Sequence, residues 1–273
     1  MNSFSGKTAL VTGASTGIGL SIANELSRRG AVVILTARSA DKLEAAEAAI
    51  RSKKGEAHVF SADLSETEAA EKLHGEITAA GLEVDLLINN AGYGRWGDFG
   101  EFEKSDYAKM IQLNITALTE LCHLFIPAMV ERGGGGVINI GSTASFLPVP
   151  FASVYSASKA YVLLFTDALR YEYADKNVRI MTICPGATDS EFRTVAAEKS
   201  PDVQSVNAAM EAKGDVGIPP EEVAIDGLDA FLQDKVYVVT GKGNGKFAML
   251  PRLLPRARVI KMVGDTFRKR LGK

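Results

Sequence analysis

The sequence predicts an α/β protein built on a doubly wound, seven-stranded parallel sheet with helices on both faces. Short apolar runs rich in β-branched residues alternate with helical patterns along most of the chain, which is typical of parallel strands buried on both sides. Right-handed crossovers between such strands produce a doubly wound sheet. The chain has 273 residues, of which 46% are hydrophobic and 23% charged, and it shows neither an internal repeat nor a low-complexity linker. One domain is therefore expected.

The strands are expected where the apolar runs lie, at residues 8–12, 31–35, 57–61, 84–89, 137–141, 178–184 and 237–240. One helix follows the first strand and ends near Arg29, and the others cover residues 41–53, 66–80, 105–131 and 155–175. Glycines 133–136 are expected to separate the fourth helix from the fifth strand, and Pro185-Gly186 to end the sixth strand.

The composition excludes several classes of protein. The two cysteines, Cys122 and Cys184, lie in apolar runs, which excludes a disulfide framework and a cysteine zinc site. The three histidines are scattered, so no metal site is predicted. No run of about 18 uncharged apolar residues occurs, and residues 1–7 do not resemble a secretion signal. We therefore expect a cytoplasmic protein without a membrane-spanning helix, and no motif indicates nucleic-acid binding.

The first strand leads directly into a glycine-rich turn and a helix. Glycine lets the backbone approach a pyrophosphate closely, and the N-terminus of the helix supplies free N–H groups. The spacing Gly-x-x-x-Gly-x-Gly is also compatible with a simple tight turn, but its position in the first βαβ unit favours dinucleotide binding. The residues expected to contact the cofactor here are Gly13, Ser15, Thr16, Gly17, Ile18 and Gly19.

The end of the second strand indicates which dinucleotide binds. An acidic residue about 20 positions after the turn would bind the ribose hydroxyls. This chain instead reads Ala37-Arg38-Ser39. A guanidinium can hold a 2′-phosphate, and the missing carboxylate removes a like-charge repulsion. We predict NADP(H), with Arg38 and Ser39 beside the phosphate; the alternative is that Arg38 is an ordinary solvated arginine.

Four polar residues and a short turn complete a recognisable order of motifs. Tyr155 and Lys159 stand four residues apart on one face of a predicted helix, and Ser142 precedes them at the end of the fifth strand. Asn114 lies in the preceding helix, and Asn-Asn-Ala-Gly at residues 89–92 ends the fourth strand. With the glycine-rich turn, this pattern resembles the short-chain dehydrogenase/reductase family, in its single-domain, NADP-preferring subgroup.

The resemblance implies hydride transfer between a nicotinamide and a carbonyl group. It makes Tyr155 the general acid of reduction and the base of oxidation, and Ser142 the residue that orients the carbonyl. A tyrosine ordinarily has a pKa of about 10, and Lys159 is expected to lower it and to hold the nicotinamide ribose. Asn114 is expected to hold a water that links Lys159 to solvent. Without the other motifs, Tyr155 and Lys159 would be interpreted as a half-buried aromatic and a surface charge.

The same resemblance implies further cofactor contacts. Asp63 is expected to bind the adenine amino group. Relatives often have a threonine five residues after Pro185 to bind the carboxamide; here that position is Ser190, so Thr188 is an equal candidate. The implied set is Asp63, Leu64, Asn90, Ala91, Gly92, Pro185, Gly186, Thr188 and Ser190.

The resemblance covers residues 5–190 and the strand near Tyr237. Residues 1–250 are therefore assigned to one Rossmann-type domain, with a mobile lid at about 187–219. Apolar side chains gather where ligands bind in this fold and favour an apolar or aromatic carbonyl or alcohol; they are Trp96, Phe146, Leu147, Val149, Phe151 and Phe192. Arg95 and Arg193 are expected to be solvated.

A basic extension, residues 251–273, follows the domain. Residues 241–273 contain ten of the 31 Lys and Arg and one of the 33 Asp and Glu, a charge of +9, which leaves −11 on the rest of the chain. An apolar stripe runs through the extension at Leu254, Val259, Val263 and Phe267. Such a helix can lie on an anionic membrane, but packing of the stripe on the body near the lid, or on a partner subunit, is favoured.

The leading functional hypothesis is an NADPH-dependent carbonyl reductase acting on a small molecule. A 3-oxoacyl thioester reductase would use the same four residues, and a basic extension would suit its anionic carrier. A non-catalytic NADPH-sensing regulator is disfavoured because Tyr155 and Lys159 are both retained. A homodimer or homotetramer is implied by the resemblance, through the helices over residues 105–131 and 155–175.

Overall fold

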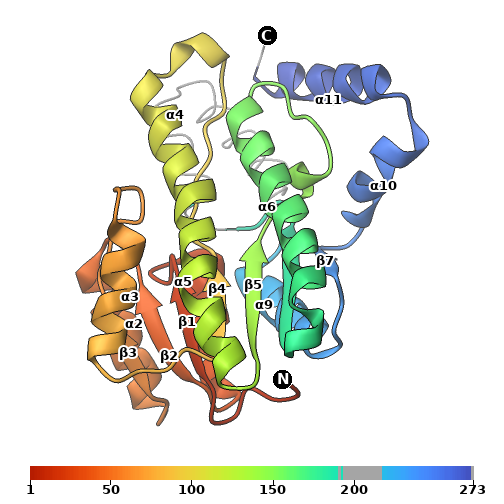
Figure 1. Cartoon of the computed structure of the whole chain (residues 1–273). Helices are drawn as coiled ribbons and strands as arrows, with labels where there is room; N and C mark the ends of the chain where they lie inside the picture. The colour runs from red at the N-terminus through yellow and green to blue at the C-terminus, as the bar shows by residue number, and fades with distance from the viewer. Residues whose placement is uncertain (190–191, 193–216, 272–273) are drawn as a thin grey trace.

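The computed structural model describes residues 1–189, 192 and 217–271 of the chain. Seven parallel strands form one sheet in the order β3-β2-β1-β4-β5-β6-β7 (Figure 1). Strands β1 and β4 are neighbours at the centre of the sheet. β2 and β3 follow β1 on one side, and β5, β6 and β7 follow β4 on the other. This confirms the predicted doubly wound sheet. Ligands bind such sheets where the strand order reverses, at the carboxyl ends of β1 and β4.

The first half of the chain builds one side of the sheet. Its strands are β1 (Thr8–Thr12), β2 (Val32–Thr36), β3 (Ala57–Val59) and β4 (Leu86–Asn89). The helices between them are α1 (Gly17–Arg28), α2 (Ala40–Ser52) and α3 (Ala69–Ala79). Most boundaries lie within one to three residues of those predicted.

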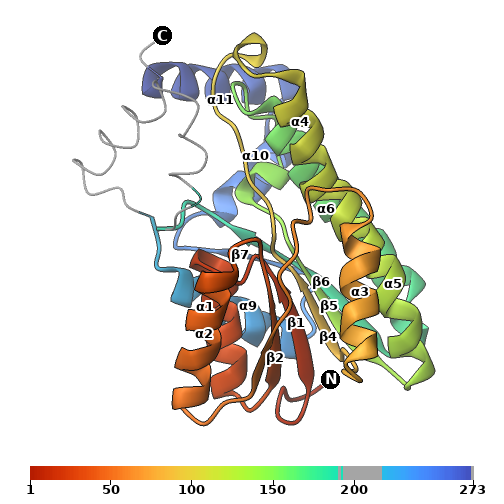
Figure 2. The same ribbon diagram turned by 90° about the vertical axis from the view of Figure 1, so that its left-hand side faces the viewer.

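The second half adds β5 (Gly135–Ile140), β6 (Val178–Pro185) and β7 (Tyr237–Thr240), with α5 (Leu118–Glu131), α6 (Ser153–Glu172) and α9 (Pro220–Leu232). Short helical turns lie at η1 (Phe99–Glu101), η3 (Thr143–Ser145) and η4 (Ala174–Lys176). Helices α1, α2 and α9 cover one face of the sheet, and α3, α5 and α6 cover the other (Figure 2). Because both faces are covered, the strands are buried almost throughout, which explains their continuous apolar sequences.

The helix predicted over residues 105–131 contains a π-helical turn. It consists of α4 (Lys104–Ile111), η2 (Gln112–Ala117) and α5, joined without interruption. Among the described residues it is the one helix that is long and apolar enough to cross a membrane, with a mean hydropathy of 1.4. Here its apolar residues, such as Leu121 and Phe125, pack into the core against α3 and the sheet. The π-turn holds the buried Asn114; such turns often mark functional sites.

Strand β5 begins two residues earlier than predicted, because Gly135 and Gly136 belong to the strand and pack closely against neighbouring elements. A Cβ at Gly135 would lie 2.7 Å from the Met129 side chain, and one at Gly136 would lie 2.5 Å from the Phe231 ring. The break in the chain comes instead from Gly133 and Gly134, which have φ values of +86° and +137°. Close approach of neighbouring elements, not chain flexibility, therefore requires glycine at 135 and 136.

Two further helices follow β7. α10 (Gly245–Leu253) and α11 (Arg256–Arg270) extend from the last strand, and α11 lies beyond the carboxyl ends of the strands (Figure 1). The sequence pattern had indicated a helical extension after residue 250, but neither α9 nor α10. The domain boundary at residue 250 stays a prediction, and α10 runs across it.

Candidate active site

Hydrogen bonds connect the glycine-rich turn with the end of β4. The Thr12 hydroxyl accepts the backbone N–H groups of Asn90 and Ala91, both at 3.0 Å. The Asn90 amide donates to the carbonyl oxygens of Thr12 and Gly13, at 2.9 and 3.2 Å. Gly13 has a φ of +65°, and a Cβ there would lie 2.8 Å from Asn90 Nδ2. Glycine is therefore required at residue 13, and Asn90 stabilises the turn.

The N-terminus of α1 is suited to bind an anion. Its N-cap residue, Thr16, makes no side-chain capping bond, and its first turn contains no acidic residue. The first N–H groups of a helix lack intrahelical acceptors and carry partial positive charge. A Cβ at Gly19 would collide with the carbonyl oxygen of Gly13, so turn and helix approach too closely for any other residue. The arrangement fits the pyrophosphate of a dinucleotide.

The loops after β2 and β3 form the predicted adenosine side. Arg38 and Ser39 are exposed beyond the end of β2. The Ser61 hydroxyl is within 3.3 Å of the carbonyl oxygens of Ala37 and Arg38, which ties the two loops together. One oxygen of Asp63 accepts the N–H and hydroxyl of Ser65, at 3.0 and 2.6 Å. A hollow of about 870 Å³ lies between Asp63 and α3 and is lined by acidic residues.

Tyr155 lies at the centre of the site, near the start of α6. Its side chain is 8% exposed, and burial raises its pKa to about 12, although a hydrogen bond with the Ser142 side chain acts in the opposite direction. Ser142 follows β5 and is held by its own hydrogen bond from the Ala144 N–H at 3.1 Å. Lys159 was expected to lower the pKa of this tyrosine, whereas in this structure burial is the largest influence and raises it. Tyr155 is therefore protonated at neutral pH, as a general acid must be.

Lys159 lies one helical turn beyond Tyr155, with its ammonium group 6.0 Å from the centre of the tyrosine ring. It donates a hydrogen bond of 2.8 Å to the carbonyl oxygen of Ile140, and its burial lowers its pKa to about 8. A Cβ at Gly92 would lie 3.5 Å from Lys159 Nζ and 3.0 Å from Asn114 Oδ1. The three residues therefore converge where the end of β4 meets α6 and the π-turn.

Asn114 is fully engaged by hydrogen bonds within the protein. Its amide group donates to the Tyr93 carbonyl oxygen at 2.9 Å and to the Ser158 hydroxyl at 3.0 Å. Its side-chain oxygen accepts the Tyr93 N–H at 3.1 Å. The side chain fixes the loop after β4 against α6. The water relay through Asn114 stays a prediction.

The loop after β6 brings Pro185 and Gly186 to the same edge of the sheet. A Cβ at Gly186 would collide with the Asn244 side chain, so this loop packs directly against the segment that leads into α10. The Thr188 hydroxyl is 3.2 Å from the Gly186 carbonyl oxygen, and Thr188 pairs with Ile218 in a short parallel bridge. Ser190 and nearly all of the segment predicted as a lid lie outside the described residues.

An apolar wall covers Tyr155. The Trp96 and Phe192 rings lie 5.3 and 5.7 Å from the tyrosine ring, centre to centre. A Cβ at Gly94 would lie 3.0 Å from the indole and 3.1 Å from the Tyr155 ring, so Gly94 leaves room for both. The cluster also contains residues of α4 and α10, and from the loop after β5 and α11 it includes Leu147, Val149, Val259, Val263 and Phe267.

The comparison with protein families agrees with this geometry. The model described as short chain dehydrogenase matches residues 7–201. The chain belongs to the short-chain dehydrogenase family. This short-chain dehydrogenase is thus an oxidoreductase that interconverts CH–OH and keto groups. The recognised order of motifs, from the glycine-rich turn to Lys159, lies entirely within the matched residues.

Similar proteins of known name differ in the substrates for which they are named. The 7beta-hydroxysteroid dehydrogenase of Clostridium sardiniense is 33% identical over 263 residues, which is 96% of each chain. The very-long-chain 3-oxoacyl-CoA reductase of Homo sapiens is 35% identical over 192 residues, 66% of this chain but only 59% of that protein. A solved short-chain dehydrogenase from Sphingobium yanoikuyae, in complex with NADPH, has a TM-score of 0.77 and 26% identity, covering 92% of this chain and 97% of that one.

Two features of the site differ from the sequence analysis. Arg95 was expected to be solvated but is only 9% exposed, and its guanidinium lies 5.1 Å from the centre of the Tyr93 ring. Arg193 lies outside the described residues. The stripe on α11 was expected to pack on the body, and it does, but its position beside Tyr155 was not foreseen. No pattern of a single helix could reveal this, because the contact joins segments about 100 residues apart.

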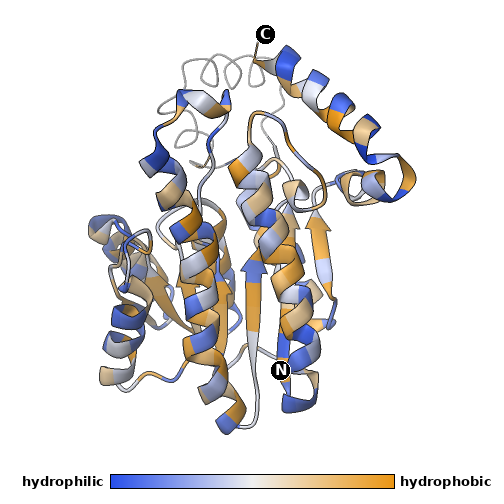
Figure 3. Ribbon diagram, turned by 45° about the horizontal axis from the view of Figure 1, so that its top comes forward, coloured by the Kyte–Doolittle hydropathy of each residue, from blue (hydrophilic) through white to orange (hydrophobic). Residues whose placement is uncertain are grey.

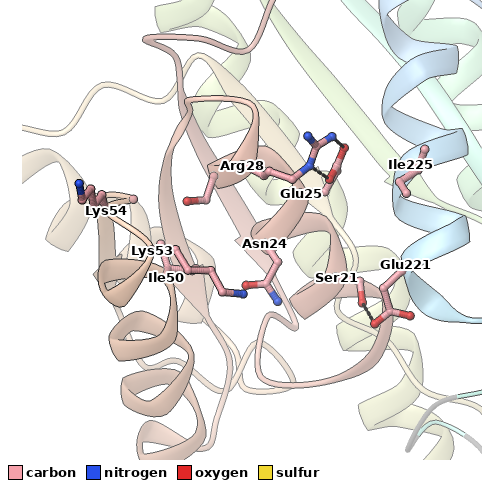
Figure 4. A pocket seen from close by; sticks show the side chains of 11 residues that line it. Ser21, Asn24, Glu25, Arg28, Ile50, Lys53, Lys54, Glu221 and Ile225 are labelled. Carbon is pink, nitrogen blue, oxygen red and sulfur yellow. Dashed lines mark hydrogen bonds and ion pairs between the residues drawn. The ribbon is translucent and has the colours of Figure 1, made fainter.

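A second hollow of about 410 Å³ lies away from this site, between α1, α2 and α9 (Figure 4). Some of its polar groups are paired with one another. Glu25 binds Arg28 at 2.6 and 2.7 Å, and the Ser21 hydroxyl donates to Glu221 at 3.2 Å. These bonds hold neighbouring side chains together, and they indicate no catalytic or binding chemistry for this hollow.

Proposed function

We propose that this short-chain dehydrogenase reduces the ketone or aldehyde group of an apolar or aromatic molecule with NADPH, and catalyses the reverse oxidation with NADP. One observation carries the proposal. A protonated tyrosine, hydrogen-bonded to Ser142, lies beneath an apolar wall at the edge of the sheet where the nucleotide turn ends. The bound cofactor would supply the hydride.

The side chains provide the remaining chemistry. Tyr155 donates its proton to the carbonyl oxygen as negative charge develops there, and in oxidation it accepts that proton. Ser142 donates a hydrogen bond to the same oxygen and orients the carbonyl group. Lys159, charged below a pKa of about 8, binds the ribose hydroxyls and favours the tyrosinate form through its charge. The Trp96 and Phe192 rings exclude water from the reacting atoms.

The phosphate-binding residues favour NADP(H). Arg38 stands exposed at the end of β2, where an acidic residue would repel a 2′-phosphate and where this chain has Ala37. The uncapped N-terminus of α1 receives the pyrophosphate. The solved relative from Sphingobium yanoikuyae binds NADPH, and a metagenomic short-chain oxidoreductase, 31% identical with a TM-score of 0.70, was solved with NADP. Both support this preference.

The substrate class follows from the wall around Tyr155. Its side chains are aromatic or aliphatic, and burying such surface favours ligands at about 25 cal/mol per Å² of apolar area. The relative from Clostridium sardiniense, which aligns over 96% of both chains, is named for a hydroxysteroid and supports an apolar substrate.

A second candidate is the reduction of a 3-oxoacyl thioester. The human relative is named for this chemistry, and a ketoacyl reductase from Nostoc sp. is 36% identical over 71% of this chain. A long acyl chain would also fit an apolar wall. The two candidates use the same tyrosine, so only the substrate distinguishes them.

The assembly and location belong to the same proposal. Ile111, Leu164 and Tyr171 are 43%, 72% and 87% exposed on α4 and α6, and burial of such side chains would favour a homodimer or homotetramer. Light scattering after size exclusion measures the mass directly. Cys122 and Cys184 are both free and buried, which is compatible with a reducing cytoplasm.

The test is NADPH oxidation by the purified protein across a panel of carbonyl compounds. The panel contains small ketones, aromatic diketones, oxosteroids and 3-oxoacyl thioesters, with Tyr155→Phe as the matched control. We expect turnover of apolar ketones and a loss of more than about 100-fold in the variant, with NADPH binding retained. Turnover of small charged keto acids alone would contradict the substrate class. NADPH binding without turnover of any carbonyl would contradict the reaction.

A further inference from the structure

Helices α10 and α11 expose many of the protein's large apolar side chains. Eleven large hydrophobic residues are exposed in the described part of the chain, and five of them lie between residues 247 and 262. They are Phe247, Met249, Leu253, Ile260 and Met262, with exposed fractions from 41% to 72%. These are not the residues of the stripe that packs beside Tyr155. Clusters of this kind mark surfaces that bind a partner or a membrane.

The same stretch of chain is rich in exposed cations. The exposed cations of this region are Lys242, Lys246, Arg252, Arg256, Arg258, Lys261, Arg268 and Lys269. The single acid of this region, Asp265, is paired with Lys261 at 2.7 Å. The body carries the opposite charge, −11 by subtraction. Figure 3 shows strongly hydrophilic and hydrophobic residues side by side along both helices.

The corner between the two helices combines both properties. Leu253, the last residue of α10, is 72% exposed and lies between Arg252 and Arg256 in the sequence. Pro255 is the N-cap of α11, and its ring restricts the backbone at the corner between the two helices. An apolar side chain flanked by arginines suits the boundary between lipid headgroups and acyl chains, where the leucine is buried and the guanidinium groups meet phosphates.

We propose that the exposed surface of α10 and α11 docks on an anionic lipid membrane. Met249 and Leu253, four residues apart on one side of α10, enter the headgroup boundary, and the arginines and lysines bind lipid phosphates. The inner surface of α11 meanwhile stays against Leu147 and Val149 in the wall beside Tyr155. When the protein is docked, only α11 separates the apolar wall of the active site from the lipid. An apolar substrate dissolved in the membrane can then reach the site.

The test measures binding of the full-length protein to sedimented vesicles. Vesicles of phosphatidylcholine alone are compared with vesicles that also contain phosphatidylglycerol, in the absence of substrate, so the result does not depend on the proposed reaction. We expect binding to the anionic vesicles only, and weaker binding at higher salt. Replacing Arg252, Arg256 and Arg258 with glutamine should weaken binding by about 100-fold.

A matched pair of variants tests the apolar contribution. Leu253→Ser should weaken vesicle binding by about tenfold, whereas Val236→Ser, at an exposed apolar residue just before β7, should not change it. Melting temperature and NADPH affinity verify that each variant is folded. Absence of binding to anionic vesicles, or binding that both the triple variant and Leu253→Ser leave unchanged, would overturn the proposal. It would also be overturned if the arginine substitutions dissociated an oligomer in solution, since the surface would then contact a second copy.

Discussion

Lys159 donates a hydrogen bond of 2.8 Å from its ammonium group to the carbonyl oxygen of Ile140, the last residue of β5. This bond joins the helix that carries Tyr155 to the strand that precedes Ser142. Burial nevertheless lowers the pKa of Lys159 to about 8, because the charged form is poorly solvated.

The pH dependence of reduction should follow Lys159. The ammonium group is charged below pH of about 8 and neutral above it, whereas Tyr155, with a pKa of about 12, stays protonated throughout this range. We expect kcat/KM for NADPH to be constant near neutral pH and to fall above pH of about 8, since this parameter reports the free enzyme. Initial rates from pH 6 to about 10 measure it. A constant value to pH of about 10 would contradict a role for the charged lysine.

Gly92→Ala should impair turnover. The added Cβ would lie 3.0 Å from Asn114 Oδ1 and 3.5 Å from Lys159 Nζ, so at least one of these groups must move. We expect kcat to fall by about tenfold, because small misplacements of positioning groups are costly in catalysis. Gly75→Ala on α3 is the matched control: nothing lies within 4 Å of its added Cβ, and alanine should stabilise the helix by up to about 1 kcal/mol. Equal activity of the two variants would refute the prediction.

Arg38→Gln should alter the choice of cofactor. Loss of the guanidinium removes a charged partner of the 2′-phosphate, so we expect KM for NADPH to rise by about tenfold with KM for NADH unchanged. Lys53→Gln, at another exposed cation near α2, should change neither value. An equal change for both cofactors would indicate a general effect on the loop instead of phosphate recognition.

Val263→Ser should alter the substrate wall. Val263 is 8% exposed, on α11, in the cluster that contains Tyr155. A hydroxyl there reduces the apolar area offered to the substrate, so KM for apolar ketones should rise by up to about tenfold while the dissociation constant for NADPH stays constant. Thr266→Ser, on a more exposed part of the same helix, is the control. An unchanged KM would place α11 outside the substrate site.

The sequence predicted most of the fold from short-range patterns. Near-continuous apolar strands between helices require a parallel sheet covered on both faces, and the sheet has the predicted number of strands. The glycines at 135 and 136 were interpreted as breakers because their spacing resembles a loop. Their actual reason, contacts with Met129 and Phe231, depends on neighbours that the local sequence does not contain.

The sequence by itself determined the family, the order of the site residues and the absence of an acid after β2, because these depend on residue identity at fixed spacing. Only the tertiary structure decided the pKa of Tyr155, the burial of Arg95 and the position of α11 beside the tyrosine. It also showed that Val259, Val263 and Phe267 pack against the body, whereas other apolar side chains of α10 and α11 are exposed. Burial is a property of what packs against a side chain, and those neighbours are distant in the sequence, so no local pattern carries it.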